Sequence, residues 1–157
     1  MKFGKVEHPE NIDFTLPKTH RDTFNVLLKN KKVDKPKIFI GCAKWNRADL
    51  KGFYPKGTKD ELAYYSKQFN SIELNATFYR NFPAEQFVKW KSKTPSNFKF
   101  FPKLGQEISH WKRLLGVEEV VNSYINNFSN LEEKLGTIFL QLHSNFGPKT
   151  LLRFKIL

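Results

Sequence analysis

Strand-like and helix-like segments alternate along most of this chain, and that alternation limits its fold more than any other feature. Short apolar runs typical of strands occur four times, at residues 37–43, 71–80, 97–103 and 137–143. Strands that alternate with helices are joined by right-handed crossovers into a parallel sheet. No Gly-rich phosphate loop follows any of these runs. The sequence therefore favours a (β/α) barrel, or part of one, over a nucleotide-binding doubly wound fold.

The intervening segments carry start and stop signals of helices. Thr58 and Glu61 have the spacing of a capping box, which predicts a helix from Thr58 to about Asn70. Further helices are expected at residues 83–94, 117–135 and 149–154. Gly136 stands where the longest of them should stop.

The first 37 residues lack the regular pattern of the rest. Phe24, Leu27 and Leu28 share one face of a predicted short helix, and the remainder of this region is polar. We therefore expect an N-terminal arm over residues 1–37 and one barrel-type domain over residues 38–157.

Composition narrows the class of protein. Cys42 is the single cysteine, which excludes an internal disulfide, and we interpret it as a small buried hydrophobe rather than a nucleophile. No apolar run approaches the roughly 20 residues of a membrane span and no secretory signal is present, so we expect a cytoplasmic protein without membrane contact. The net charge of +12 suggests a polyanionic partner, but the basic residues are spread thinly, which favours a solvated surface.

A series of motifs, met in order along the chain, resembles one known family. They are Gly41-Cys42-Ala43-Lys44-Trp45, Gly52-Phe53-Tyr54-Pro55, residues 69–80, residues 98–103, Ile108-Ser109-His110, Arg113-Leu114 and residues 135–142. The series resembles the YecE-like family, a domain of unknown function numbered seventy-two. The resemblance implies a TIM-type (β/α)₈ barrel and no established activity or cofactor.

The length of the chain adds an expectation to that resemblance. A complete barrel of this type needs about 250 residues, so the match implies an incomplete half barrel of about four parallel strands, truncated after the fourth. The outer edges of the first and fourth strands would then be unpaired. We expect such a half barrel to self-associate through these edges or to be poorly soluble.

Polar and aromatic residues gather at the C-terminal ends of the predicted strands, where barrel enzymes have their active sites. Side-chain alternation places Glu73 and Asn75 on one face of their strand, with Ile72 and Leu74 turned towards the helices. The candidate catalytic residues are Glu73, Lys103 and His110. The candidate substrate-binding residues are Trp45, Asn75, Tyr79, Arg113 and Gln141.

Several interpretations of these residues stay open. Glu73 and Lys103 either form a structural ion pair, or act as an acid–base group and an anion clamp with a histidine as second proton carrier. The second interpretation suits an enzyme for a small anionic or phosphorylated substrate, unless the truncated chain is inactive. Glu73, His110 and His143 lack tight metal-ligand spacing, so we expect no metal. The alternative function is a non-catalytic nucleic-acid-binding module that uses basic and aromatic loop residues.

Overall fold

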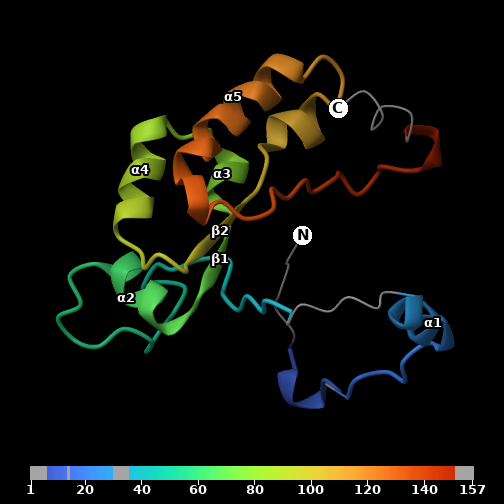
Figure 1. The fold of residues 1–157 in the computed structure, drawn as a ribbon, viewed down its shortest axis with the longest axis horizontal. Coiled ribbons are helices and arrows are strands. Elements are labelled where there is room, and N and C mark those ends of the chain that lie inside the picture. Colours follow the sequence, from blue (N-terminus) through green and yellow to red (C-terminus); the bar gives the residue numbers. More distant parts are fainter. Residues whose placement is uncertain (1–6, 14, 30–35, 151–157) are drawn as a thin grey trace. The chain divides into compact units, whose positions relative to one another are not determined.

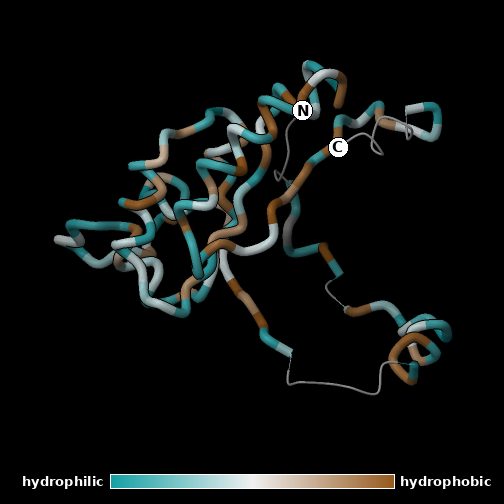
Figure 2. Tube along the Cα trace, turned by 45° about the horizontal axis from the view of Figure 1, so that its top comes forward, coloured by the Kyte–Doolittle hydropathy of each residue, from teal (hydrophilic) through white to brown (hydrophobic). Residues whose placement is uncertain are grey.

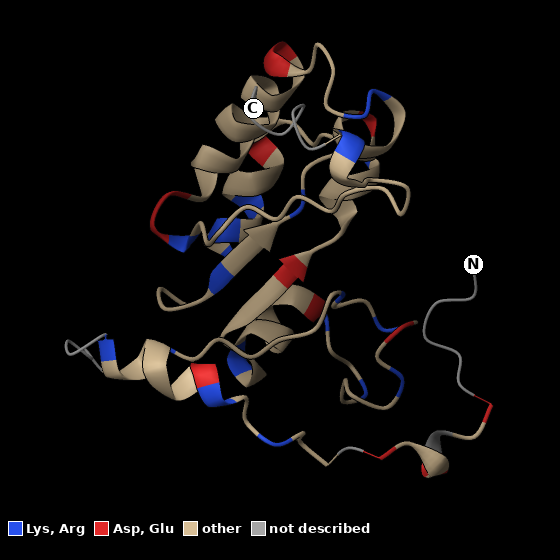
Figure 3. Cartoon of the chain, turned by 90° about the vertical axis from the view of Figure 1, so that its right-hand side faces the viewer, with Lys and Arg blue, Asp and Glu red and all other residues tan. Residues whose placement is uncertain are grey.

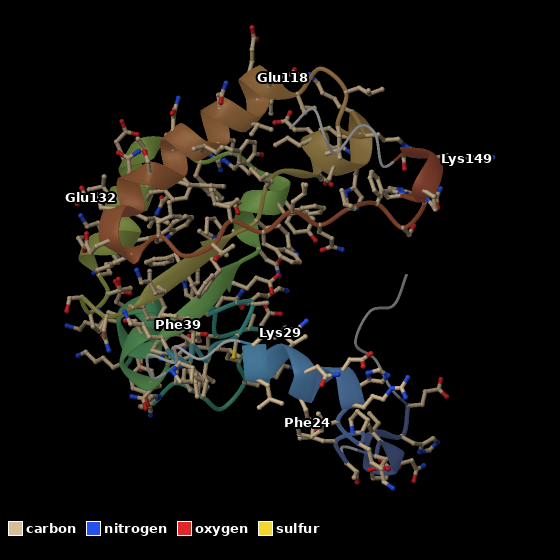
Figure 4. All side chains as sticks on the ribbon, turned by 45° about the vertical axis from the view of Figure 1, so that its right-hand side comes forward. Phe24, Lys29, Phe39, Glu118, Glu132 and Lys149 are labelled. Carbon is tan, nitrogen blue, oxygen red and sulfur yellow. The ribbon has the colours of Figure 1, made fainter. Side chains whose placement is uncertain are left out.

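The computed structural model describes residues 7–13, 15–29 and 36–150. Contacts within the chain divide it into two units, Met1–Lys37 and Ile38–Leu157. The first unit holds a 3₁₀ turn, η1 (Pro9–Asn11), and the helix α1 (Arg21–Lys29), which is the short helix predicted there. Its apolar side chains, including Phe24, are exposed (Figure 4).

A two-stranded parallel sheet lies at the centre of the second unit (Figure 1). Strand β1 (Ser71–Leu74) pairs with β2 (Lys99–Pro102), so that Ser71 lies opposite Lys99 and Leu74 opposite Pro102. The remaining elements are α2 (Glu61–Gln68), α3 (Ala76–Tyr79), α4 (Ala84–Ser92), a π-helical turn η2 (Glu107–Trp111), α5 (Glu118–Phe128) and a 3₁₀ turn η3 (Ser129–Lys134). The described part of the chain is thus an α/β fold with parallel strands.

Aromatic rings fill the core between the sheet and its helices. Ile72 and Leu74 of β1 are fully buried there, as side-chain alternation predicted. They pack with the largest buried side chains of the unit, Tyr65, Phe87, Phe98, Phe100 and Phe128. Burial of so many rings makes the core the main stabilising element of this unit.

The segment at residues 38–42 runs beside β1 without forming a regular ladder. Glu73 donates its backbone N–H to the Cys42 carbonyl at 3.1 Å, and the Tyr65 hydroxyl bridges the Cys42 N–H and the Ser71 carbonyl. A Cβ atom at Gly41 would lie 1.9 Å from the Ser71 oxygen, so only glycine allows this approach. The prediction of a strand covered on both faces is wrong here: the apolar side chains of this segment, a brown stretch in Figure 2, include Ile38 at 69% exposure.

The segment at residues 135–142 runs parallel to β2 on its other side. Bridges join Phe100 to Leu135 and Lys103 to Phe139. The segment therefore advances by four residues while the chain of β2 advances by three. The extra residue is a β-bulge. Gly136 lies within it, where an added Cβ would meet the Phe101 ring at 2.6 Å. The expected strand at residues 137–143 is therefore an irregular parallel segment.

Two predictions about helix ends are corrected by the structure. Asp60, rather than Thr58, caps α2 by accepting the Ala63 N–H at 3.0 Å, because Thr58 instead donates its hydroxyl to the Pro55 carbonyl. The long helix ends as α5 at Phe128 and continues only as η3, whose labelled Glu132 has a φ of 49° (Figure 4). Of the helix expected at residues 149–154, residues 151–154 lie outside the described part.

The strand expected at residues 71–80 is also shorter than predicted. The strand ends at Leu74, and Asn75 has the α-helical backbone conformation. The Asn75 N–H donates to the Glu73 carbonyl at 2.9 Å, and α3 follows at once. Alternation therefore stops after Leu74, and the expected shared face of Glu73 and Asn75 is not formed.

Candidate functional site

A buried lysine at the end of β2 is the centre of the candidate site. The Lys103 side chain is 8% exposed, and its Nζ lies 3.1 Å from Glu73 Oε1 and 2.9 Å from Gln141 Oε1. Its ammonium also lies over two rings, 5.5 Å from the centre of Phe78 and 5.2 Å from that of Phe139. Three residues predicted for the site, from three neighbouring parallel segments, thus meet at one ammonium.

Thr77 fixes the backbone beneath this lysine. Its hydroxyl lies 2.7 Å from both the Leu74 and the Lys103 carbonyl oxygens, and it accepts the Lys103 N–H at 3.1 Å. Thr77 is fully buried and joins the end of β1 to the residue that follows β2. Thr77 was not predicted as a site residue, although it lies in the motif at residues 69–80.

His110 and His143 form the second part of the site. Their ring centres are 5.1 Å apart, and His110 also packs edge-on against Phe78 at 5.1 Å. Burial, then the neighbouring His143 and the charge of Lys103, lower the pKa of His110 below its ordinary value. The lowered pKa favours the neutral imidazole, which is the form that can accept a proton. The buried Ser109 hydroxyl lies 2.8 Å from its Nδ1.

Glu73 faces an open hollow on the side of the sheet away from the core. The hollow measures about 360 Å³ and is lined by Phe39, Gly41, Ser71, Glu73, Phe101, Thr137 and Phe139. The Glu73 side chain is 43% exposed, so its carboxylate contacts both solvent and the Lys103 ammonium. A ligand in this hollow could exchange a proton with Glu73.

The other predicted residues lie in two separate places. Trp45, Asn75 and Tyr79 line a second cleft, of about 310 Å³, beside the end of β1. Arg113 lines a narrow crevice together with Ser109 and His143. The structure therefore divides the predicted site into a Glu73–Lys103–Gln141 cluster, a neighbouring histidine pair with Arg113, and an aromatic cleft.

Other classes of site find less support in the described part of the chain. No group of three or more His, Cys, Asp or Glu side chains there is arranged to hold a metal ion, so the alternative ligand set of Glu73, His110 and His143 is not assembled. Within the same residues, none of the helices has the length and apolar character needed to cross a membrane. In Figure 3, basic and acidic residues lie scattered over several elements.

The sequence of this chain is similar to those of several known proteins. Residues 39–156 match the sequence profile described as "Protein of unknown function DUF72". The UPF0759 protein YecE of Escherichia coli K12 is 30% identical over 117 residues, which are 73% of this chain and 40% of that relative. The UPF0759 protein YunF of Bacillus subtilis 168 is 36% identical over 78 residues, 48% of this chain and 27% of that relative.

Solved structures agree on the fold. Two crystal structures of a DUF72 family protein from Enterococcus faecalis V583 superpose with TM-scores of 0.62 and 0.53, at 20% and 23% identity. The matches cover 76% and 60% of this chain and 46% and 41% of the solved chains. The chain thus spans less than half the length of the relatives it matches. With its sequence match and its fold in agreement, this chain belongs to the DUF72 family, whose function is unknown.

Proposed function

We propose that the Glu73–Lys103–Gln141 cluster is an enzyme-type acid–base site for a small anionic or phosphorylated substrate. The observation that carries the proposal is the buried Lys103 ammonium, which lies 3.1 Å from a half-exposed carboxylate and next to a histidine of lowered pKa. The Glu73 carboxylate is partly exposed, so a substrate anion can displace it from the Lys103 ammonium. A buried ammonium with such a partner is a binding point for an anion. Glu73 and His110 are then the proton carriers, and Gln141 orients Lys103.

We also propose that the four parallel segments belong to the wall of a TIM-type (β/α) barrel. Two observations support this: the segments follow the order 38–42, β1, β2 and 135–142 in both sequence and space, and β1, β2 and 135–142 pair in parallel. In such a barrel the residues after each strand meet at one mouth. Lys103 directly follows β2, so in the proposed barrel the cluster would lie at that mouth.

Inorganic phosphate is a suitable probe of this site. We expect phosphate, but not chloride at equal ionic strength, to shift the imidazole NMR signals of His110 and His143 in a saturable way. Lys103→Met should weaken phosphate binding at least tenfold, whereas Lys51→Met, in an exposed loop, should leave it unchanged. Equal responses to phosphate in both variants would refute the proposal and leave Lys103 with a structural role.

The second candidate function, nucleic-acid binding without catalysis, rests on the net charge of +12 and on exposed rings such as Tyr79 and Trp111. This function predicts binding to single-stranded DNA that weakens steeply with salt. Lys103→Met would not change such binding, because that lysine is buried.

A further inference from the structure

The second cleft, beside the end of β1, has the features of a ring-binding subsite. We propose that it binds an uncharged planar ring of the same substrate whose anionic group Lys103 holds. This inference rests on the proposed function and extends it to a substrate class: a small molecule that joins a flat heterocycle to an anionic group. The cleft, of about 310 Å³, is large enough for such a ring.

Two aromatic side chains form walls of the cleft. Trp45 is held by an edge-on contact with Trp90, whose ring centre lies 5.6 Å away at 79°. Tyr79 is 72% exposed, and its ring packs nearly perpendicular to that of Phe78, with the ring centres 5.1 Å apart. An anchored indole and an accessible phenol ring offer the stacking surfaces that flat rings prefer.

Amide side chains supply the polar part of the lining. Asn75 lines the cleft and makes no capping hydrogen bond to α3 with its side chain, so its carbonyl and NH₂ groups are not engaged by the start of that helix. Asn46 uses its Oδ1 to accept the Asp49 N–H at 2.9 Å, so that its NH₂ group remains. Paired donors and acceptors of this kind recognise the hydrogen-bonding edge of a heterocycle.

The charge of the lining favours a neutral ring. Among the described residues that line the cleft, Lys44 is the one with a charged side chain, and its Nζ lies 3.2 Å from Asp49 Oδ1. The cleft therefore contributes no lone charge that would attract an anion. The anionic part of a ligand should be held at Lys103 instead.

The chain itself connects the cleft to the Lys103 cluster. Asn75 follows Glu73 by two residues and donates its N–H to the Glu73 carbonyl. Tyr79 packs on Phe78, and the Phe78 ring contacts both Lys103 and His110. The cleft and the Lys103 cluster are therefore neighbours on the segment from β1 to α3, and the proposed ligand would have to span this segment.

Three probes test the proposal: adenosine, inorganic phosphate and adenosine monophosphate. We expect adenosine to shift the indole N–H signal of Trp45 and not that of Trp111, and phosphate to shift His110. Adenosine monophosphate should shift both and bind at least tenfold more tightly than either part. Tyr79→Ala should weaken adenosine binding about tenfold and leave phosphate binding unchanged, because the phenol ring stacks on the base and does not contact the anion. Trp111→Ala, at another exposed ring, is the matched control.

The two proposals fail in different ways. If phosphate shifts His110 but neither adenosine nor its monophosphate shifts Trp45, the ring-binding cleft is refuted and the proposed function stands. If adenosine shifts Trp45 but phosphate leaves His110 unchanged, the proposed function is refuted, and with it the joined substrate. Equal weakening of adenosine binding by Tyr79→Ala and Trp111→Ala would also refute the cleft.

Discussion

Removal of the Tyr65 hydroxyl should destabilise the second unit by about 2 kcal/mol. This hydroxyl donates to the Ser71 carbonyl at 3.1 Å and accepts the Cys42 N–H at 2.5 Å, and so replaces ladder bonds between the first segment and β1. Tyr65→Phe keeps the fully buried ring and deletes two hydrogen bonds of about 1 kcal/mol each. Urea unfolding should show a lower midpoint at unchanged m-value, and the melting temperature should fall by roughly 4–8 °C.

Tyr64→Phe is the matched control for this measurement. Tyr64 is the neighbouring residue on α2 and is half-buried against Phe53 and Tyr54. Within the part of the chain that the structure describes, its hydroxyl joins no pair of segments, so the variant should unfold within about 0.5 kcal/mol of the parent chain. Equal stability of Tyr65→Phe and Tyr64→Phe would refute the placement of residues 38–42 beside β1.

Four other predictions follow from the structure. Lys103→Met and His143→Gln should each raise the pKa of His110 in an NMR titration, but not to its ordinary value because burial remains the largest cause; an unchanged pKa would contradict the geometry. Gly136→Ala should cost about 1–3 kcal/mol in urea unfolding, because the new methyl group meets the Phe101 ring, whereas Gly147→Ala meets nothing and should be neutral. Stability should fall as pH rises above about 10, because burial raises the pKa of three tyrosines that ionise more readily once unfolded; flat stability between pH 9 and 11 would contradict this. The three are Tyr54 and Tyr124, with a pKa of about 12, and Tyr65. Size-exclusion chromatography with light scattering should show self-association through the exposed apolar side chains of the outer segments, and a sharp monomer peak would refute that expectation.

The sequence was sufficient for much of the fold. Alternation of strand-like and helix-like segments predicted the parallel pair of β1 and β2, because strands connected by helices pair in parallel through right-handed crossovers. Alternation of side chains between the two faces of one strand predicted that Ile72 and Leu74 are buried. Proximity of Glu73 and Lys103 also followed, since the C-terminal ends of adjacent parallel strands lie at one edge.

Local backbone departures limited what could be predicted about the site. Asn75 leaves the extended conformation, so its expected place beside Glu73 was wrong. The helix before Gly136 breaks at Glu132, yet its apolar spacing continues because residues three apart lie on one side of both α- and 3₁₀-helices. Thr77 and the two rings around Lys103 escaped prediction, since their roles depend on contacts between segments distant in the sequence.

Phosphate affinity of Glu73→Gln tests the central claim most directly. If Lys103 binds the anionic group of a substrate, the Glu73 carboxylate competes with that group for the same ammonium. Removal of its charge should then tighten phosphate binding, read from the His110 signal, while Lys103→Met weakens it. Unchanged or weaker phosphate binding in Glu73→Gln would contradict the account and make the pair a structural salt bridge.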